Sequence, residues 1–266
     1  MGAETNHEDA QFLTGSPQRR AILRAVCDDP ARPSELCDRV DATRTTVQRI
    51  LAGFRDREWV VKCDGQYRAT ITGRRVIEQY ETLLDELDRA REFAPLATHL
   101  GREQEEIPGS VLTTSDLTVA TDSDPLAPLE EFLEWYRGAT GEDIRGVSPV
   151  ATRTTNQVAT DLLDAGTRIE LVIDGGVLEH ASSEHEDAFE RALEDDNVSV
   201  FLHPEPLSFG LLLRENAFAL GAYDEQNNFR ALLRSDDPDA YAWAEQKYER
   251  VRSRSQPLEQ AVSGPE

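Results

Sequence analysis

A run of seven residues at positions 43–49, Thr-Arg-Thr-Thr-Val-Gln-Arg, is dense in side chains that form specific hydrogen bonds. Arginine can bridge O6 and N7 of guanine, glutamine can bridge N6 and N7 of adenine, and threonine can contact a thymine methyl group. Such side chains read DNA from the N-terminal part of a helix that lies in the major groove. The predicted DNA-binding residues in this region are Thr43, Arg44, Thr45, Thr46, Gln48 and Arg49, with Ser34 upstream.

The charge of the chain is divided unevenly along its length. Residues 16–75 hold 13 basic and 8 acidic side chains, a net charge of +5, whereas the remaining residues sum to −28 within a total of −23. A polyanion such as DNA is repelled by most of this molecule and tolerated by one small part of it. The charge distribution therefore indicates the same region as the polar run.

The basic side chains are almost all arginine, because the chain has only two lysines, Lys62 and Lys247. An acidic excess with little lysine resembles the proteins of archaea that accumulate salt; an ordinary acidic cytosolic protein is the alternative. At molar salt the Debye length is only about 3 Å, so close contacts must carry more of any DNA binding than long-range attraction.

The elements that must position the polar run are predicted over residues 16–71. Ser16 can cap a first helix, a second begins near Ser34, and Thr43 can cap a third helix that runs to about Arg57. Apolar residues at helical spacing should turn one face of the third helix into a core, with a glycine at Gly53 that costs about 1 kcal/mol against alanine. The predicted core positions of this helix are Val47, Ile50, Leu51 and Phe54.

Two alternating runs follow, residues 59–62 and 66–71, separated by Asp64-Gly65, a strong hairpin signal. The order of helices and hairpin resembles the winged helix-turn-helix domain of archaeal and bacterial transcription regulators. The run that carries this resemblance is PSELCDRVDATRTTVQRILAGFRDREWVVKCDGQYRATITGRR. The resemblance implies that the hairpin contacts phosphates or the minor groove through Lys62, Gln66 and Arg68.

The three cysteines, Cys27, Cys37 and Cys63, all lie in the basic segment. Their spacing fits no zinc site, and an odd number argues against a disulfide framework. We predict small buried core residues, with a thiol redox sensor as the alternative.

Residues 72–104 are predicted to link and dimerise the chain, beginning with one long helix over 72–94 that Pro95 ends or kinks. A heptad seam that favours pairing with a second chain is formed by Val76, Tyr80, Leu83, Leu87, Ala90 and Ala94. The alternative is that this seam packs only against its own chain.

Residues 105–255 alternate between strand and helix patterns, which predicts an α/β sheet covered by helices and a two-domain α+β chain overall. Residues 1–15 and 256–266 are expected to be flexible. Expected strands are 110–112, 117–120, 144–150, 168–173, 198–202, 210–213, 217–223 and 229–233. Expected helices are 126–137, 154–163, 176–193 and 238–252.

This part resembles the middle domain of the methanogenesis-regulator-like family of archaeal winged-helix proteins. The runs that carry the resemblance are GVSPV, GTRIELVIDGGVLE, NVSVFLHPEPLSFGLLLRENAFALGAYDE and FRALLRSDDPDAYAWAEQKYERVR. The resemblance implies half of a phospholipase-D-type fold, whose active members carry H-x-K-x-x-x-x-D on a hairpin. The matching positions here are Ser208, Gly210 and Glu215, so the nucleophile and the phosphate clamp of that chemistry are missing.

A ligand of such a sheet is expected beyond the carboxyl ends of its strands. The predicted ligand-binding residues are Ser148, Arg153, Asp174, His203 and Ser208, with Thr154 and Asn156 nearby. Each also has a structural interpretation as a turn, helix cap or strand exit. No cofactor is predicted, and His180, His185 and His203 have no metal-site spacing.

The sequence favours a cytoplasmic, homodimeric transcription regulator that binds promoter DNA and responds to a small-molecule effector through its acidic domain. No apolar run approaches the length of a membrane span. Two alternatives stay open: a hydrolase on a degenerate phospholipase-D-like fold, and a winged-helix adaptor that binds protein.

Overall fold

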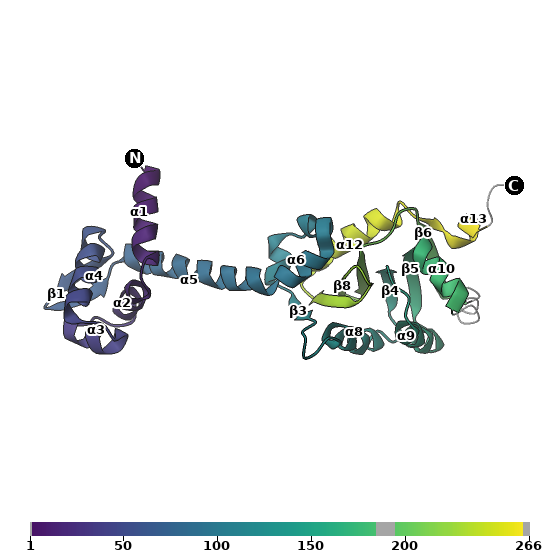
Figure 1. Cartoon of the computed structure of the whole chain (residues 1–266), viewed down its shortest axis with the longest axis horizontal. Helices are drawn as coiled ribbons and strands as arrows, with labels where there is room; N and C mark the ends of the chain where they lie inside the picture. Colours follow the sequence, from purple (N-terminus) through teal and green to yellow (C-terminus); the bar gives the residue numbers. More distant parts are fainter. Residues whose placement is uncertain (1, 185–194, 263–266) are drawn as a thin grey trace. The chain divides into compact units, whose positions relative to one another are not determined.

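The computed structural model describes residues 2–184 and 195–262 and divides into two compact units, Met1–Asp88 and Arg89–Glu266 (Figure 1). Each unit has its own core. Within the described residues, no helix is both long and apolar enough to cross a membrane.

The N-terminal unit is mainly helical, with one small hairpin, in the order expected for its basic segment (Figure 1). Its core gathers the predicted apolar faces, including Ile22, Leu36 and Phe54, none of which is exposed to solvent. The elements are α1 Gly2–Thr14, α2 Pro17–Asp28, α3 Pro33–Val40, α4 Arg44–Asp56, β1 Val60–Cys63, β2 Gln66–Ala69 and α5 Ile71–Glu92.

The helix ends follow local chemistry, with one correction. Thr43 caps α4 as predicted, because its side chain accepts a hydrogen bond from the backbone N–H of Thr46 at 3.3 Å. Ser34, however, does not cap α3. That helix begins one residue earlier at Pro33, and the carboxylate of Glu35 accepts a hydrogen bond from the backbone N–H of Arg32 at 2.7 Å. The tight turn between α3 and α4 has Asp41 in the left-handed conformation, at φ 46°.

The predicted hairpin is present between β1 and β2. Asp64 and Gly65 both have positive φ, 50° and 79°, which matches the twist of a two-residue hairpin turn. Cys63 pairs with Gln66 and Val60 with Ala69, so β1 lies one residue later than the expected run 59–62, and β2 ends two residues before the end of the expected run 66–71.

The segment predicted as a flexible N-terminus forms helix α1, which packs on the rest of this unit. Phe12 packs edge-on against Phe54, with ring centroids 5.7 Å apart, and the guanidinium of Arg57 lies 3.9 Å from the centre of its ring. Arg57 also pairs with Asp9 at 2.7 Å. The ring of Phe12 fills the space beside Gly53, where an added Cβ would overlap Cζ of Phe12 and lie 2.8 Å from its Cε2. Gly53 is therefore a docking point for α1.

A double-mutant cycle tests this docking. In a Phe12→Ala background, Gly53→Ala should raise the free energy of unfolding of this unit by about 1 kcal/mol, because alanine is the better helix former. In the wild type the same substitution should not raise the free energy of unfolding, because the added methyl group displaces the ring of Phe12. The measurement is urea unfolding of the four proteins. Equal effects of Gly53→Ala in both backgrounds would contradict the docking of α1 on α4.

Helix α5 ends at Glu92, two residues before the predicted end, and the rest of the expected linking region forms separate elements. After Phe93, the chain continues as α6 Ala94–Leu100 and a 3-10 helix Gly101–Glu106. Lys247, one of the two lysines, is buried against this 3-10 helix, with its ammonium 2.5 Å from Glu103 and 3.2 Å from Glu106.

The C-terminal unit is a mixed eight-stranded sheet in the order β10-β6-β5-β4-β7-β8-β9-β3. β4, β5 and β6 are parallel, and the other pairings are antiparallel. The strands are β3 Asp116–Val119, β4 Asp143–Val147, β5 Arg168–Asp174, β6 Val198–His203, β7 Phe209–Arg214, β8 Ala217–Tyr223, β9 Phe229–Ser235 and β10 Gln256–Pro257.

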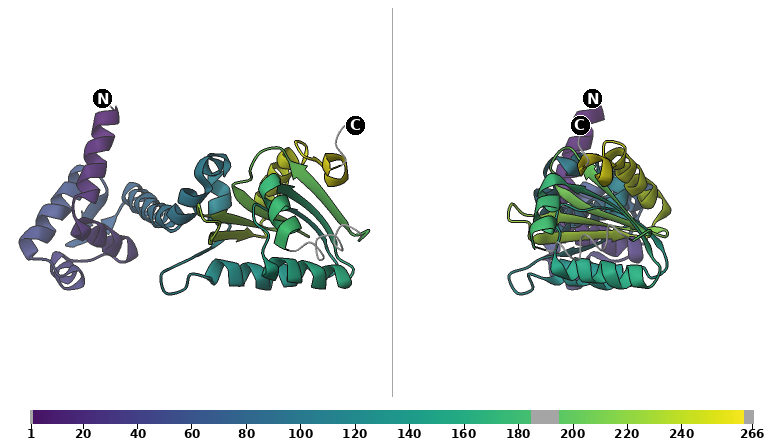
Figure 2. Two further views of the ribbon diagram at one scale, coloured as in Figure 1. Left: turned by 45° about the vertical axis from the view of Figure 1, so that its right-hand side comes forward. Right: turned by 90° about the vertical axis from the view of Figure 1, so that its right-hand side faces the viewer.

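Helices cover both faces of this sheet (Figure 2). One core joins α6 and α12 to the sheet, and a second core joins α8 and α9 to the sheet. This is the helix-covered sheet that the alternation predicted. The helices of this unit beyond α6 are α7 Gly109–Thr113, α8 Ala127–Arg137, α9 Arg153–Asp164, α10 Gly175–Glu184, α12 Pro238–Arg252 and α13 Leu258–Val262.

Two expectations for this unit differ from the structure, and a third extends beyond the described residues. Residues 110–112, predicted as a strand, belong to α7. The C-terminal residues predicted as flexible include β10, which pairs with β6, and α13. The predicted helix 176–193 corresponds to α10 as far as Glu184, and its remaining residues, with His185, lie outside the described residues.

Candidate DNA interface and ligand cavity

Helix α4 separates its side chains cleanly into a core face and a solvent face. Val47, Ile50 and Phe54 are at most 3% exposed, because they pack into the core of the N-terminal unit. The opposite face presents four of the predicted DNA-binding residues to solvent: Arg44, Thr45, Gln48 and Arg49. Within the described part of the chain, none of these four side chains has a hydrogen-bond or ion-pair partner. They are free to bind an external group.

The other two threonines of the run are already engaged. Thr43 Oγ1 lies 2.9 Å from Thr46 Oγ1 and accepts the Thr46 backbone N–H, so both side chains build the start of α4. Ser34 is exposed in the first turn of α3. The predicted DNA-binding residues of this run are therefore of two kinds: two threonines that build the start of α4, and four side chains that are exposed on α4 without a partner in the described residues.

The hairpin residues divide between its two faces. Val61 pairs with Arg68 and Cys63 with Gln66, so Arg68 and Gln66 share one face of the hairpin, and Arg68 is exposed. Lys62 pairs with Tyr67 on the other face, and its ammonium lies 5.7 Å from the centre of the Tyr67 ring. The three predicted hairpin contacts thus do not form one cluster.

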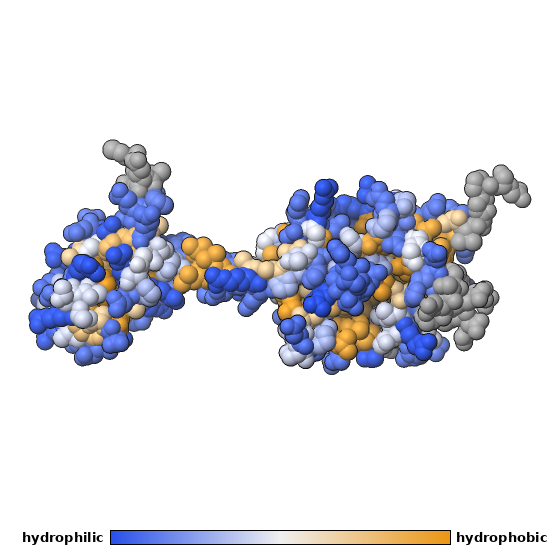
Figure 3. Space-filling view, in the orientation of Figure 1, coloured by the Kyte–Doolittle hydropathy of each residue, from blue (hydrophilic) through white to orange (hydrophobic). Residues whose placement is uncertain are grey.

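The predicted seam on α5 also has two parts. Val76 and Tyr80 are half-buried against the core of their own unit. Leu83 and Leu87 are 52% and 45% exposed, which is unusual for large apolar side chains. Figure 3 shows hydrophobic surface along α5.

The cysteines differ in exposure. Cys27 is buried, and burial raises the pKa of its thiol, which disfavours the reactive thiolate. Cys37 is half-buried and Cys63 is exposed, so the prediction of three buried core residues is wrong for Cys63. Among the described residues, no group of three or more potential ligands could hold a metal ion.

In the C-terminal unit, the predicted ligand residues are not gathered in one place. Asp174 is buried, and its two carboxylate oxygens accept hydrogen bonds from the backbone N–H groups of Val177 and Leu207, at 2.9 and 2.8 Å. His203 is also buried, with Nδ1 2.8 Å from the carbonyl oxygen of Glu205. These hydrogen bonds to the backbone of the same unit hold both side chains in place within the fold.

The remaining predicted ligand residues lie in different parts of this unit. Arg153 and Thr154 lie exposed at the start of α9, and Ser208 lies exposed before β7. Ser148 and Asn156 do line a cavity, although the Ser148 hydroxyl donates to the carbonyl oxygen of Val150 at 2.7 Å.

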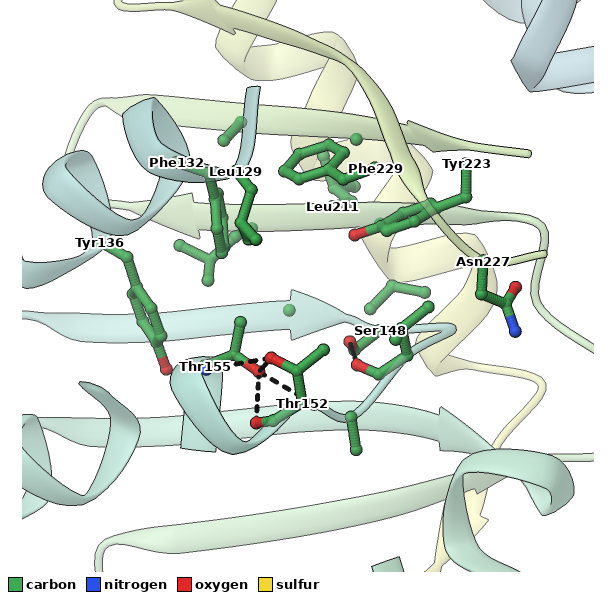
Figure 4. A pocket seen from close by; sticks show the side chains of 18 of the residues that line it. Leu129, Phe132, Tyr136, Ser148, Thr152, Thr155, Leu211, Tyr223, Asn227 and Phe229 are labelled. Carbon is green, nitrogen blue, oxygen red and sulfur yellow. Dashed lines mark hydrogen bonds between the residues drawn. The ribbon is translucent and has the colours of Figure 1, made fainter. Parts of the chain in front are cut away.

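That cavity, of about 580 Å³, lies between the sheet and helices α8 and α9 (Figure 4). Strands β4, β5, β7, β8 and β9 provide its floor, with apolar side chains such as Leu171 and Leu211. Helix α8 contributes Leu129, Phe132 and Tyr136. A second hollow of about 740 Å³ lies near Asp174 and is lined also by His180, Pro204 and Glu205.

Glycines on the strands let aromatic rings lie flat in the first cavity. A Cβ on Gly210 would lie 2.8 Å from the hydroxyl of Tyr223, and one on Gly221 would lie 2.8 Å from the ring of Phe229. The two rings stack with centroids 5.0 Å apart and an interplanar angle of 14°. An irregularity in the β8–β9 pairing falls at Ala222 and Tyr223, next to this stack.

Two tyrosines bring polar atoms to this apolar space. Tyr136 is 6% exposed, and burial raises the pKa of Tyr136 and of Tyr223, so both hydroxyls stay protonated at neutral pH. Neither hydroxyl has a hydrogen-bond partner within the residues described. Neither tyrosine is recognisable as a site residue from the sequence, because a tyrosine in an apolar pattern is indistinguishable from a core residue before the chain is folded.

Two family models match parts of the chain. Residues 125–254 match the model of the middle domain of the methanogenesis regulatory protein FilR1, and residues 7–92 match the model of the HVO_A0261 N-terminal domain. The residues that line the cavity described above all lie within the first match, and the second match ends with the last residue of α5. The predicted resemblance to the methanogenesis-regulator-like family is confirmed. No curated protein matches the chain.

Solved structures are similar only distantly. TrmBL2, an archaeal chromatin protein, has 12% identity and a TM-score of 0.43, covering 91% of this chain and 94% of its own. NucT from Helicobacter pylori has 12% identity and a TM-score of 0.43, covering 54% and 98%. Nuc, a phospholipase D family member from Salmonella typhimurium, has 9% identity and a TM-score of 0.41, covering 54% and 97%. Below a TM-score of 0.5, these likenesses carry no argument about function.

Proposed function

We propose that this chain is a DNA-binding transcription regulator whose N-terminal unit acts as a winged helix-turn-helix domain. The observation that carries the proposal is the solvent face of α4. Two arginines, a glutamine and a threonine stand there without partners in the described residues, in the most basic part of an acidic chain. In this domain α4 is the recognition helix and the β1–β2 hairpin is the wing, which contacts the DNA backbone through Arg68. The match to a domain of a regulatory protein supports the same role.

We propose no catalytic role. The phospholipase-D motif requires a histidine and a lysine at the start of the β7–β8 hairpin, where this chain has Ser208 and Gly210. An exposed serine without an adjacent base is a weak nucleophile. The FilR1 middle domain serves instead as an effector-binding domain, and a bound effector changes the affinity of the chain for its operator.

The protein acts as a homodimer in this proposal, because two copies of α5 can pair along the exposed leucines and so read two half-sites. Leu83→Glu should weaken dimerisation by about tenfold or more, because a carboxylate would be buried without a partner. Thr82→Glu, an exposed neighbour on another face of α5, is the matched control and should leave the dimer intact. Sedimentation equilibrium measures both, and a Leu83→Glu protein that stays as dimeric as wild type would remove α5 from the interface.

Mapping the binding sites of the protein on the chromosome of its source cells tests the regulatory role. The expected result is a small set of discrete sites near promoters that share an inverted repeat, since a symmetric dimer reads two related half-sites. Recovery of a protein partner with no enriched DNA would instead favour an adaptor role.

A further inference from the structure

We propose that the cavity between the sheet and helices α8 and α9 binds an uncharged, aromatic small molecule that carries a hydrogen-bonding group. The inference rests on the proposed function in one respect: this molecule would be the effector. The volume of about 580 Å³ falls in the range of small-molecule sites, and the walls are mostly apolar.

Charge in the lining argues against an ionic ligand. Arg230 is the one charged side chain among the residues that line this cavity. No ion pair joins it to Asp224 within the described residues: hydrogen bonds from Asn228 hold the pKa of the Asp224 carboxyl low, and Arg230 adds only the smallest contribution. The rest of the lining is uncharged and mostly apolar, so a carboxylate or phosphate buried there would lose its hydration against a single guanidinium. A cationic ligand would find no carboxylate there.

The hydrogen-bonding part of the ligand is indicated by the two tyrosines. The Tyr136 hydroxyl has no partner in the described residues and is not among the fully buried unpaired atoms, so it keeps accessible surface at which a ligand group can bond to it. In Figure 4, Tyr136 and Tyr223 stand on opposite sides of the cavity; the Tyr223 hydroxyl is turned toward the space between them, and the Tyr136 hydroxyl is turned toward the side of Thr155. The nearby hydroxyls of Thr152 and Thr155 are already bonded to each other at 2.9 Å, so the polar side chains of the lining that have no hydrogen-bond partner in the described residues include the two tyrosines and the amides of Asn156 and Asn227.

The aromatic character follows from the rings in the lining. Phe229 stacks on Tyr223 and meets Phe132 edge-on, with centroids 5.8 Å apart. Together these rings form two walls that meet at an angle. A planar aromatic ligand can stack on one wall and meet the other with its edge, which are the two favoured geometries of aromatic pairs.

The first test uses the full chain and the neutral fluorescent probe N-phenyl-1-naphthylamine. Saturable binding of one probe per chain is expected, and the anionic probe 1-anilinonaphthalene-8-sulfonate should bind at least tenfold more weakly. Ala159→Trp, which fills the cavity from α9, should weaken binding of the neutral probe at least tenfold. Ala242→Trp on exposed helix surface is the matched control and should change nothing. Equal binding of both probes, or full binding to the Ala159→Trp protein, would overturn the proposal.

Tyr136→Phe keeps the ring and removes only the hydroxyl, so it tests the hydrogen bond without disturbing the fold. 1-Naphthol should displace the probe more strongly than naphthalene from the wild type, and Tyr136→Phe should reduce this advantage by about two- to tenfold. An unchanged advantage would remove Tyr136 from the site. Neither assay contains DNA. Lost probe binding with intact promoter binding would reject only the cavity ligand, and saturable probe binding without promoter preference would reject only the DNA role.

Discussion

Replacing Arg44 and Arg49 together with alanine is expected to lower the affinity for promoter DNA by about a hundredfold or more. Each guanidinium is exposed on α4 and has no partner in the described residues, so it is available for a bidentate contact with guanine. Each such contact contributes about 1–3 kcal/mol of discrimination between bases. The fold should be unaffected, because exposed substitutions usually change the free energy of unfolding by less than about 0.5 kcal/mol.

Fluorescence anisotropy with labelled promoter DNA measures this loss. The matched control replaces Arg102 and Arg254 with alanine, since both are exposed in the C-terminal unit and the change in net charge is the same. If the control loses as much affinity as the α4 variant, net charge alone governs binding. Full binding by the α4 variant would show that DNA is read elsewhere.

Gly73→Ala is expected to destabilise the N-terminal unit by about 3 kcal/mol. Gly73 is buried in the first turn of α5, and its backbone N–H donates to Thr70 Oγ1 at 3.1 Å. A Cβ at this position would overlap the carbonyl oxygen of Trp59 and lie 2.9 Å from the carbonyl carbon. These are backbone atoms, which no side-chain rotation can move aside, so the start of α5 must shift away from the hairpin.

Amide hydrogen exchange of the full chain resolves the two units and measures this effect. Faster exchange is expected in α4 and the hairpin, with no change in the sheet of the C-terminal unit. Gly109→Ala is the control, because no atom lies within 4 Å of an added Cβ there. Unchanged protection in the Gly73→Ala protein would contradict the close packing of α5 on the residues before β1.

Much of the N-terminal unit was predictable because its signals are local. The spacing of Val47, Ile50 and Phe54 determined which face of α4 is buried, and the exposed face followed from it. The hairpin turn was equally local, because Asp64-Gly65 favours the two positive φ angles that a tight turn requires.

Features that depend on distant residues were not predictable in the same way. Helix α1 has an acidic, weakly patterned sequence, and it is held by contacts with distant residues, such as the ring of Phe12 against a glycine 41 positions away. The cavity is assembled from five strands and several helices, so no stretch of sequence contains its pattern. Asp174 has the residue type and position of a ligand contact, yet both its oxygens are used by backbone N–H groups.

The central claim, that the α4 face reads specific DNA, is tested most directly by titrating the wild-type protein against two duplexes across a series of salt concentrations. One duplex is the upstream region of its own gene, and the other has the same composition in shuffled order. The account predicts weaker binding to both as salt rises, because counterions are released from the phosphates, with a preference for the natural sequence at every salt concentration. Equal affinity for the two duplexes throughout would contradict it.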